Sequence, residues 1–332
     1  MRSSVPFLQA NSLAVVILLF SLTNMACAAT VVPTYPERPI RFIVPFPPGG
    51  GVDIVARALA REMTEKLGQQ VVVDDRPGAT GIIGTQIAAQ ATADGYTLLM
   101  GNVATHAINV SMFKKLPYDP VKDFRPITLV ARVPEILIVN PSLPVHSVRD
   151  LIALAKAKPG QITFGSAGMG SPPHMAAELF KSMAGINIVH IPYKGSTLAL
   201  NDLLGGRIGM DFSNILSPMR HIKSGRLRAL GVTSGKRSIV APDVPTIAES
   251  GLPGFELYSW YGVFAPSATP KAILTRLHQS IAQILTTREV VDRLTSQGAD
   301  VAPGSPEEFA RFIKTEIRTY AKIVKDGGLR VE

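Results

Sequence analysis

The sequence predicts an α/β protein whose sheets are built mostly from parallel strands. Strand-like and helix-like segments alternate along the chain, an order that produces parallel sheets covered by helices on both faces. Glycine-rich turns join several strand ends to helix starts, and a proline-rich stretch between residues 117 and 144 separates two such alternations. These three observations predict two α/β domains joined by extended crossover segments.

The first alternation occupies residues 40–100. Apolar and β-branched runs predict strands, and apolar residues with a period near 3.6 predict helices. Each helix would connect two parallel strands, because such strands need a long crossover connection. The expected strands are 40–44, 71–74 and 97–100, and the expected helices are 54–67 and 82–91.

Extended segments lead into the second alternation. Six prolines interrupt the chain between residues 117 and 144, and the apolar runs 127–131 and 136–139 among them are expected to be extended. The run 257–264 is again extended and is expected to return to the first domain. The remaining expected helices are 148–157, 172–184, 197–204, 271–285, 288–297 and 306–325, and the remaining strands are 162–164, 188–191, 208–212 and 227–232.

Residues 1–28 have the pattern of a cleaved secretory signal peptide. Arg2 supplies positive charge, residues 13–22 form an apolar stretch too short to span a bilayer, and Ala26-Cys27-Ala28 provides a small-residue cleavage site. Cleavage would leave 304 of the 332 residues, with no cysteine and a net charge of +8 instead of +9. We therefore expect an exported protein without disulfides or cysteine-bound metal. Lipidation of Cys27 is the alternative, although the usual leucine three positions upstream is absent.

The basic composition does not indicate a nucleic-acid partner. Lysines and arginines are scattered, aromatic residues make up only 6% of the chain, and export would remove the usual target. No later segment is long and apolar enough to predict a membrane helix. The net charge fits either a solvated basic surface or an attraction for anions.

A glycine-rich turn after the first strand predicts an anion-binding site. Pro48-Gly49-Gly50-Gly51 follows the strand, and Asp53 lies at the start of the helix. A helix N-terminus leaves backbone N–H groups unpaired and carries a partial positive charge, so it attracts anions. Asp53 is expected to be the N-cap rather than a ligand contact.

A similar strand–glycine–helix arrangement recurs in the second alternation. Gly165, Gly168 and Gly170 precede Ser171, which is expected to cap a helix that begins with two prolines. The turn 78–84 offers a third arrangement of this kind. Two such sites that face each other would suit a ligand with two carboxylates.

Several single residues near these turns have two interpretations. His174 could donate to a carboxylate or be a surface histidine, and His106 could face a ligand or lie in a solvated loop. Tyr193 could offer its hydroxyl to a ligand, whereas Lys194 is expected to face solvent. Trp260, the only tryptophan, could form a packed hinge or a pocket wall with its tyrosine neighbours.

The enzyme motifs in this chain are incomplete. Ser166 lies in a segment that lacks the first glycine of the nucleophile elbow G-x-S-x-G, because Phe164 stands there. The run 231–237 is one residue short of a Walker A loop and ends in Arg237 instead of Ser or Thr. The histidines do not form a metal-binding pattern. We therefore expect neither a catalytic site nor a metal or other cofactor.

Seven short motifs, spread in order along the chain, point to one family. They are Tyr35-Pro36-x-Arg38-Pro39-Ile40, Pro47-Pro-Gly-Gly-Gly-Val-Asp53, Arg76-Pro-Gly-Ala-x-Gly81, Asp94-Gly-Tyr-Thr-Leu98, Ile191-Pro-Tyr-Lys-Gly195, Asp202-Leu-Leu-Gly-Gly206 and Val244-Pro-Thr-Ile-Ala-Glu249. Together they resemble the solute-binding receptors of tripartite tricarboxylate transporters, also called Bug-type receptors. The resemblance covers nearly the whole chain after the expected leader.

The resemblance implies a two-lobed periplasmic-binding-protein fold of the Venus-flytrap type (type II), with a mostly parallel sheet in each lobe. Lobe 1 would comprise residues 29–130 and 258–332, lobe 2 would comprise residues 131–257, and the crossovers would lie near 127–134 and 257–264. A small carboxylate would bind between the lobes, held by backbone amides, small hydroxyls and water. The receptor would work in the periplasm as a monomer and deliver its ligand to a large and a small membrane subunit.

The resemblance also implies which residues contact the ligand. Phe46 would touch its apolar part. Thr80 and Met169 depart from the family pattern, in which smaller residues are expected. The implied ligand-binding residues are Phe46, Pro48, Gly49, Gly50, Asp53, Ala79, Thr80, Gly81, Asn102, Ser166, Gly168, Gly170, Ser171, His174, Tyr193, Asp211 and Asn214.

Two other functions remain open at this point. A ligand sensor for a membrane signalling protein would use the same site, and the sequence does not separate it from a transport receptor. An exported hydrolase would use Ser166 or Ser171 with His174, but no orienting acid or oxyanion arrangement is readable.

Overall fold

The computed structural model describes residues 1, 35–296, 298–326, 328 and 329. The chain from Pro36 to Glu332 is a single compact unit, and the fold described below lies within it. The expected signal peptide lies almost entirely outside the described residues, so it stays a prediction. Among the residues that are described, none of the helices combines the length and apolar character that a membrane crossing requires.

The first half of the structure is built around one buried strand. β1 (Ile40–Val44) pairs in parallel with both β2 (Val71–Asp75) and β3 (Thr97–Asn102). The helices α2 (Gly51–Leu67) and α3 (Ile82–Ala89) make the crossovers between these strands. Both helices were expected, because their apolar residues recur at the helical period. This half therefore confirms the β-α-β-α-β order.

A single long strand connects the two halves. β4 (Phe124–Val139) pairs antiparallel with β9 (Tyr258–Pro266) as far as Pro134, and from Glu135 onward it pairs with β7 (Met210–Asn214). The runs 127–131 and 136–139 are thus parts of one strand, although prolines flank them. The register shifts between Pro126 and Thr128, and such an irregularity lets a strand accept a residue without an N–H.

The second half repeats the strand order of the first. β5 (Thr163–Ser166) pairs in parallel with β6 (Val189–Pro192) and with β7, and β8 (Arg228–Val232) pairs with the far side of β4. The order β6-β5-β7-β4 mirrors the order β2-β1-β3-β9. In each half, the three strands joined by helices are parallel and the fourth is antiparallel. This is the two-lobed α/β architecture expected from the sequence.

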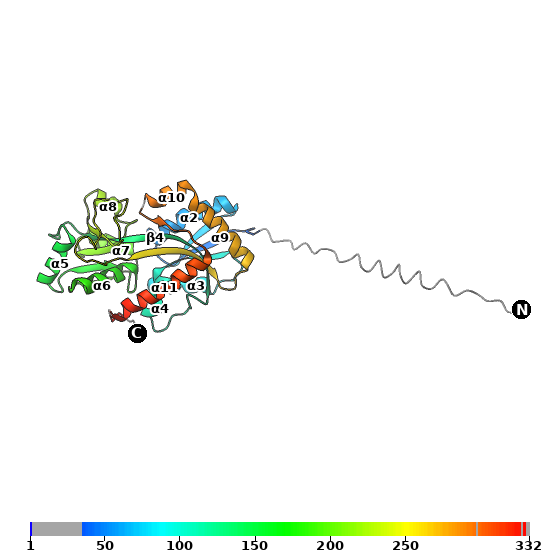
Figure 1. Ribbon diagram of the computed structural model, residues 1–332, viewed down its shortest axis with the longest axis horizontal. Coiled ribbons are helices and arrows are strands. Elements are labelled where there is room, and N and C mark those ends of the chain that lie inside the picture. The colour runs from blue at the N-terminus through cyan, green and yellow to red at the C-terminus, as the bar shows by residue number, and fades with distance from the viewer. Residues whose placement is uncertain (2–34, 297, 327, 330–332) are drawn as a thin grey trace. The chain divides into compact units, whose positions relative to one another are not determined.

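The helices separate into two groups, as Figure 1 shows. α5 (Val148–Ala157), α6 (Pro172–Ala184), α7 (Ser196–Leu204) and α8 (Met219–Lys223) gather around the second half. In the first half, α2 lies against α9 (Lys271–Thr286) on one face of the sheet. Both α5 and α6 begin and end at the residues expected from the sequence.

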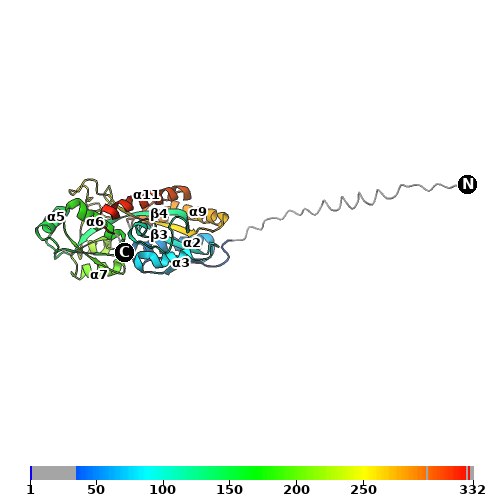
Figure 2. The same ribbon diagram turned by 90° about the horizontal axis from the view of Figure 1, so that it is seen from below.

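The opposite face of the first half is covered by the C-terminal helix. α11 (Pro306–Asp326) lies against β4 and against a helical segment made of η2 (Ala104–Ile108) and α4 (Asn109–Met112). Figure 2 shows α11 running along β4. The segment 104–112 has no counterpart among the expected elements. Two further elements, α10 (Arg288–Thr295) and β10 (Asp300–Val301), complete this half, and β10 pairs antiparallel with β4.

Trp260 belongs to the packing between β9 and α11. Its ring meets Phe309 and Phe312 edge-on at centroid distances of 5.6 and 5.5 Å, and its Nε1 donates to Glu316 at 2.9 Å. Aromatic pairs with this geometry add to the free energy of burial. The packed interpretation of Trp260 is therefore the one that the structure supports.

Close packing of β9 against α11 gives the first testable prediction. A Cβ added at Gly262 would collide with the ring of Phe309 and lie 3.1 Å from the carbonyl oxygen of Thr128. Gly262→Ala should therefore lower the free energy of unfolding by about 1–3 kcal/mol, the usual cost of overpacking a core. Urea denaturation measures the change. Gly205→Ala is the matched control, because its nearest atom would be 3.5 Å away, and equal stability of the two variants would contradict the packing described here.

Candidate functional site

Two adjoining cavities lie where the two halves meet. The deep cavity has a volume of about 40 Å³ and the outer cavity about 420 Å³, and both are lined by Phe46, Pro47 and Ala167. The deep cavity is also lined by Gly50, Gly51, Val52, Asn102, Glu135, Pro172, Pro173, Ser196, Thr197, Asn214, Ser259 and Tyr261. The outer cavity is also lined by Pro77, Gly78, Ala79, Thr80, Gly81, Gly168, Tyr193, Lys194 and Gly195.

The N-terminus of α2 opens onto the deep cavity. Gly50 is the N-cap, and the N–H groups of the first helical residues, Gly51 and Val52, have no acceptor within the helix. Both residues line the cavity. The positive end of the helix dipole therefore favours an anion there.

Asp53 holds the loop before α2, and its expected role as N-cap is corrected. It lies in the first turn, and Oδ2 accepts a hydrogen bond from the N–H of Gly49 at 2.8 Å. Its carboxylate also pairs with Arg57 at 2.6 Å. Asp53 is buried, it shapes the glycine turn through the bond to Gly49, and it lines neither cavity.

The loop before α6 is not a second copy of the loop before α2. The N–H groups of Gly168, Gly170 and Ser171 donate to Ser166 Oγ, His174 Nδ1 and the Gly168 carbonyl oxygen, each at 3.1 Å. Pro172 and Pro173 remove two more donors. Ser171 occupies the N-cap position, but its hydroxyl makes no capping bond, which corrects the expected cap. Most of the donors that the sequence suggested here are therefore already paired.

The second helix start at the deep cavity is the N-terminus of α7 and not that of α6. Gly195 is the N-cap with φ 142°, a value that favours glycine, and the following residues Ser196 and Thr197 line the deep cavity. No acidic residue lies in the first turn of α7. Thr197 Oγ1 donates to the Pro48 carbonyl oxygen at 3.4 Å, across the two halves. The signal was present in the sequence, since Gly195 stands between a strand and a helix that starts with Ser and Thr.

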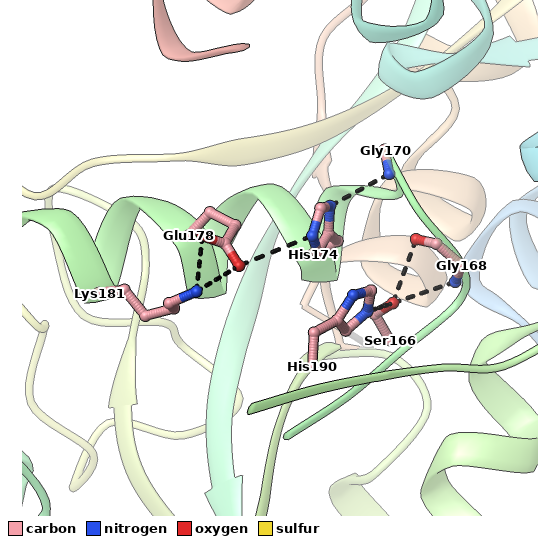
Figure 3. Close-up of polar contacts among 7 residues, drawn as sticks. All are labelled: Ser166, Gly168, Gly170, His174, Glu178, Lys181 and His190. Carbon is pink, nitrogen blue, oxygen red and sulfur yellow. Dashed lines mark hydrogen bonds and ion pairs between the residues drawn. The ribbon is translucent and has the colours of Figure 1, made fainter. Parts of the chain in front are cut away.

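Two stacked histidines, His174 and His190, hold the loop before α6 in place through hydrogen bonds (Figure 3). His190 Nε2 lies 2.6 Å from Ser166 Oγ, and the ring of His190 stacks on that of His174 at 4.2 Å. His174 accepts from Gly170 through Nδ1, and its Nε2 is 3.7 Å from Glu178, which pairs with Lys181 at 2.9 Å. His174 is buried, so the surface interpretation is wrong, and because it lines neither cavity, its expected contact with a ligand carboxylate stays a prediction.

The contacts of Ser166 and the two histidines differ from the catalytic arrangement expected of a hydrolase. Ser166 meets His190 and not His174. Within the described part of the chain, no carboxylate hydrogen-bonds to His190, whose other face stacks on Phe164 at 4.8 Å. Burial lowers the pKa of His174 to about 3 and that of His190 to about 4. Both rings are therefore neutral and serve as hydrogen-bonding supports for the loop.

Two residues that line the outer cavity have a strained backbone conformation. Ala79 and Thr80 have φ of 47° and 51°, in the left-handed region that costs non-glycine residues about 1–2 kcal/mol each. Thr80 Oγ1 donates to the Met169 carbonyl oxygen at 2.7 Å, and Asn109 Nδ2 donates to the Thr80 carbonyl oxygen at 3.2 Å. These bonds hold the turn in place, and the first of them joins the two halves.

Polar groups at the junction of the halves complete the deep cavity. Asn214 Nδ2 donates to the Tyr261 hydroxyl at 2.6 Å, and Ser259 Oγ donates to Glu135 Oε1 at 2.5 Å. Glu135 and Ser259 were not among the expected site residues, because each is a lone polar residue in an apolar strand. Among the residues described, no three His, Cys, Asp or Glu side chains gather as a metal site would require.

The implied ligand-binding residues fall into three groups. Those that line the deep cavity are Phe46, Gly50, Asn102 and Asn214. Those that line the outer cavity are Phe46, Ala79, Thr80, Gly81, Gly168 and Tyr193. Pro48, Gly49, Asp53, Ser166, Gly170, Ser171, His174 and Asp211 line neither cavity and lie in the surrounding structure.

His106 is part of the core, which corrects both of its expected interpretations. It is fully buried, and its ring stacks on Phe264 at 3.8 Å. Its Nδ1 lies 2.8 Å from the hydroxyl of Thr105. Burial lowers the pKa of His106 to about 3, so this ring is neutral as well.

Acidification should destabilise the protein through these histidines. The pKa of His174 is about 3 in the folded state against an ordinary 6.5, so between these values the unfolded chain binds a proton that the folded chain does not. The stability contributed by each such histidine is therefore complete above about pH 6.5 and falls by about 2 kcal/mol at pH 5. The buried carboxyls of Glu135 and Asp211, whose pKa values are raised, act in the opposite direction, so the histidine contribution is measured as a difference between variants in urea unfolding at pH 7 and pH 5.

A matched pair of variants isolates His174 from His106 and His190. His174→Asn retains an acceptor for Gly170 and should lose less stability than the wild type between the two pH values. His146→Asn, at an exposed position, should behave like the wild type. The same loss in His174→Asn as in the wild type would show that His174 is not held neutral.

The comparisons with known proteins agree on one family. The model of the tripartite tricarboxylate transporter family receptor matches residues 55–329. BugT of Bordetella pertussis (strain Tohama I) is 42% identical over 318 residues, which cover 96% of this chain and 98% of that protein.

Solved structures are similar over the same range. R. palustris Rpa4515 with adipate is 39% identical with a TM-score of 0.87, and the match covers 89% of this chain and 98% of that chain. MatC from Rhodopseudomonas palustris with bound malate is 31% identical with a TM-score of 0.83, covering 87% and 100%. The periplasmic binding protein BugD is 35% identical with a TM-score of 0.86, covering 90% and 100%.

These matches confirm the family and the two-lobed fold expected from the seven motifs. They identify relatives that are transporter receptors and periplasmic binding proteins. The chain belongs to the receptor family of tripartite tricarboxylate transporters, whose members are periplasmic solute-binding proteins.

Proposed function

We propose that this receptor captures a small carboxylate between its lobes and delivers it to a tripartite tricarboxylate transporter. The observation that carries the proposal is the meeting of two helix N-termini, those of α2 and α7, at the deep cavity. Each end supplies unpaired N–H groups and a partial positive charge. No lysine or arginine lines this cavity, so these backbone groups would hold the anion.

The volumes of the two cavities fit a carboxylate with a short body. A water-sized group needs about 10–15 Å³ on this measure, so 40 Å³ accommodates one carboxylate group and little more. The remainder of the ligand would occupy the outer cavity, where Phe46 offers an apolar surface and Lys194 a positive charge. The Tyr193 hydroxyl in this lining already donates to Asp202 at 2.8 Å. The similar structures with adipate and with malate make short dicarboxylic acids the first candidates.

Capture would take place by closure of the lobes. We propose that lobe 1 is 29–130 with 258–332, that lobe 2 is 131–257, and that the crossovers near 127–134 and 257–264 act as the hinge. The bonds Thr80–Met169, Thr197–Pro48 and Asn214–Tyr261 join the halves around the cavities. A ligand that touches both lobes would favour this joined arrangement. The large and small membrane subunits would then recognise it.

A thermal-shift panel tests the proposed ligand class. Residues 29–332, freed of co-purified ligand, would be heated with mono-, di- and tricarboxylates, acidic amino acids and aromatic acids. A micromolar ligand at millimolar concentration should stabilise the protein by about 4 kcal/mol and raise Tm by several degrees. Adipate and malate are expected to be among the effective compounds. No shift with any carboxylate would contradict the proposed function.

Two glycines test whether the α2 turn is the site, one in the turn and one outside both cavities. A Cβ at Gly51 would lie 2.5 Å from the Tyr261 hydroxyl and 2.6 Å from Asn214 Oδ1, whereas a Cβ at Gly205 would meet nothing closer than 3.5 Å. Gly51→Ala should therefore disturb the junction and weaken binding of the best acid at least tenfold. Gly205→Ala, which lines neither cavity, should bind within a few-fold of the wild type. Calorimetric titration measures both, and undiminished binding by Gly51→Ala would place the site elsewhere.

A further inference from the structure

Glu135 occupies the point where β4 passes from one half to the other. Pro134 is still paired with Tyr258 of β9, and Glu135 is the first residue paired with Asn214 of β7. Its backbone is fixed by Thr233, whose Oγ1 accepts from the Glu135 N–H at 2.8 Å and whose N–H donates to the Glu135 carbonyl oxygen at 2.9 Å. The side chain has little freedom to move away from this point.

Glu135 is buried and is one of the residues that line the deep cavity. The residue is 0% exposed, and it is the only carboxyl side chain among the described residues that line this cavity. Oε1 accepts from Ser259 Oγ at 2.5 Å, whereas Oε2 is buried without a hydrogen-bond partner. A buried polar atom without a partner costs free energy, so a ligand group that bonds to it would gain affinity.

The surroundings of Glu135 favour its neutral form. The titratable groups that face it are Asp211 on β7, Tyr261 on β9 and Tyr320 on α11. None of these is cationic, and no lysine or arginine is among the groups that shift the pKa of Glu135. Burial raises the pKa of the Glu135 carboxyl to about 8 and that of Asp211 well above its ordinary value. At neutral pH, Glu135 therefore carries a proton that Oε2 can donate.

We propose that Glu135 is a specificity-determining residue that donates a hydrogen bond from Oε2 to the carboxylate in the deep cavity. The receptor thus binds its acid together with one proton held at the junction of the halves. This inference rests on the proposed function and deepens it. The preferred substrate is an anionic carboxylate that enters the deep cavity, and a ligand that presents an ammonium group there is disfavoured.

The protonated donor makes binding depend on pH in one direction. An anionic oxygen against Oε2 stabilises the proton, so the pKa of Glu135 is higher in the complex than its free value of about 8. Below this pH the proton is present in both states, and affinity is constant. Above it, binding requires uptake of one proton, so affinity falls toward about tenfold per pH unit.

Glu135→Gln keeps a hydrogen-bond donor at this position and removes its titration. The carboxamide retains an N–H donor of similar shape but has no titration in this range. The matched control is Glu316→Gln, a second buried carboxyl on α11 that accepts from Trp260 and lines neither cavity. Both variants and the wild type would be titrated calorimetrically with adipate, malate and the most stabilising acid of the panel between pH 6 and pH 9.5.

The expected result is a wild-type affinity that is constant to about pH 7.5 and falls severalfold or more by pH 9.5, with proton uptake detected by buffers of different ionisation heat. Glu135→Gln should lose this fall and the proton uptake, whereas Glu316→Gln should retain both. A wild-type affinity that is flat to pH 9.5 would overturn the inference and leave the proposed function intact. A fall that persists in Glu135→Gln and disappears in Asp211→Asn would assign the proton to Asp211 and also overturn it. Failure of every acid to bind would overturn the proposed function and this inference together.

Discussion

The antiparallel pairing of β4 with β9 determines where the two halves join and where the cavities lie. β4 changes partners between Pro134 and Glu135, leaving β9 for β7. Helix starts that follow the carboxyl ends of parallel strands meet near this change of partner, as expected for ligand sites in open α/β sheets. The deep cavity therefore contains residues of both halves and of the strands that connect them. Both cavities follow from this one arrangement of backbone hydrogen bonds.

The described lining of the deep cavity has no cationic side chain, so an anion bound there would be held by backbone groups. Backbone N–H groups at the starts of α2 and α7 offer partial charges that are fixed in direction and need no reorganisation when an anion arrives. They do not distinguish one carboxylate from another. Discrimination must therefore come from the volume of the outer cavity and from the side chains at the junction. Among them we propose Glu135, because its Oε2 is buried without a hydrogen-bond partner.

Sequence reasoning recovered the elements whose signals are local. The strands β1 and β6 and the helices α5 and α6 lie within about one residue of their expected positions, because periodicity, caps and glycines are read over short windows. The segment 104–112 was missed, since its apolar residues are explained only by α11 lying over it. The prolines in β4 suggested a broken segment, whereas pairing on both sides makes it one strand.

The parts of the candidate site that were predicted are those formed by residues close together in the sequence. The turn before α2 was recognised because a strand, three glycines and a helix suffice to create unpaired N–H groups. The loop before α6 has the same pattern, but its N–H groups donate to Ser166 and His174. The pattern does not reveal these two acceptors. Glu135 left no signal, because its importance depends on strand pairing across the chain. Thr80 and Met169, where the resemblance led us to expect smaller residues, are bonded to each other across the halves. The strained turn at Ala79 and Thr80 is thereby held by the opposite half, so residues of both halves set the dimensions of the outer cavity.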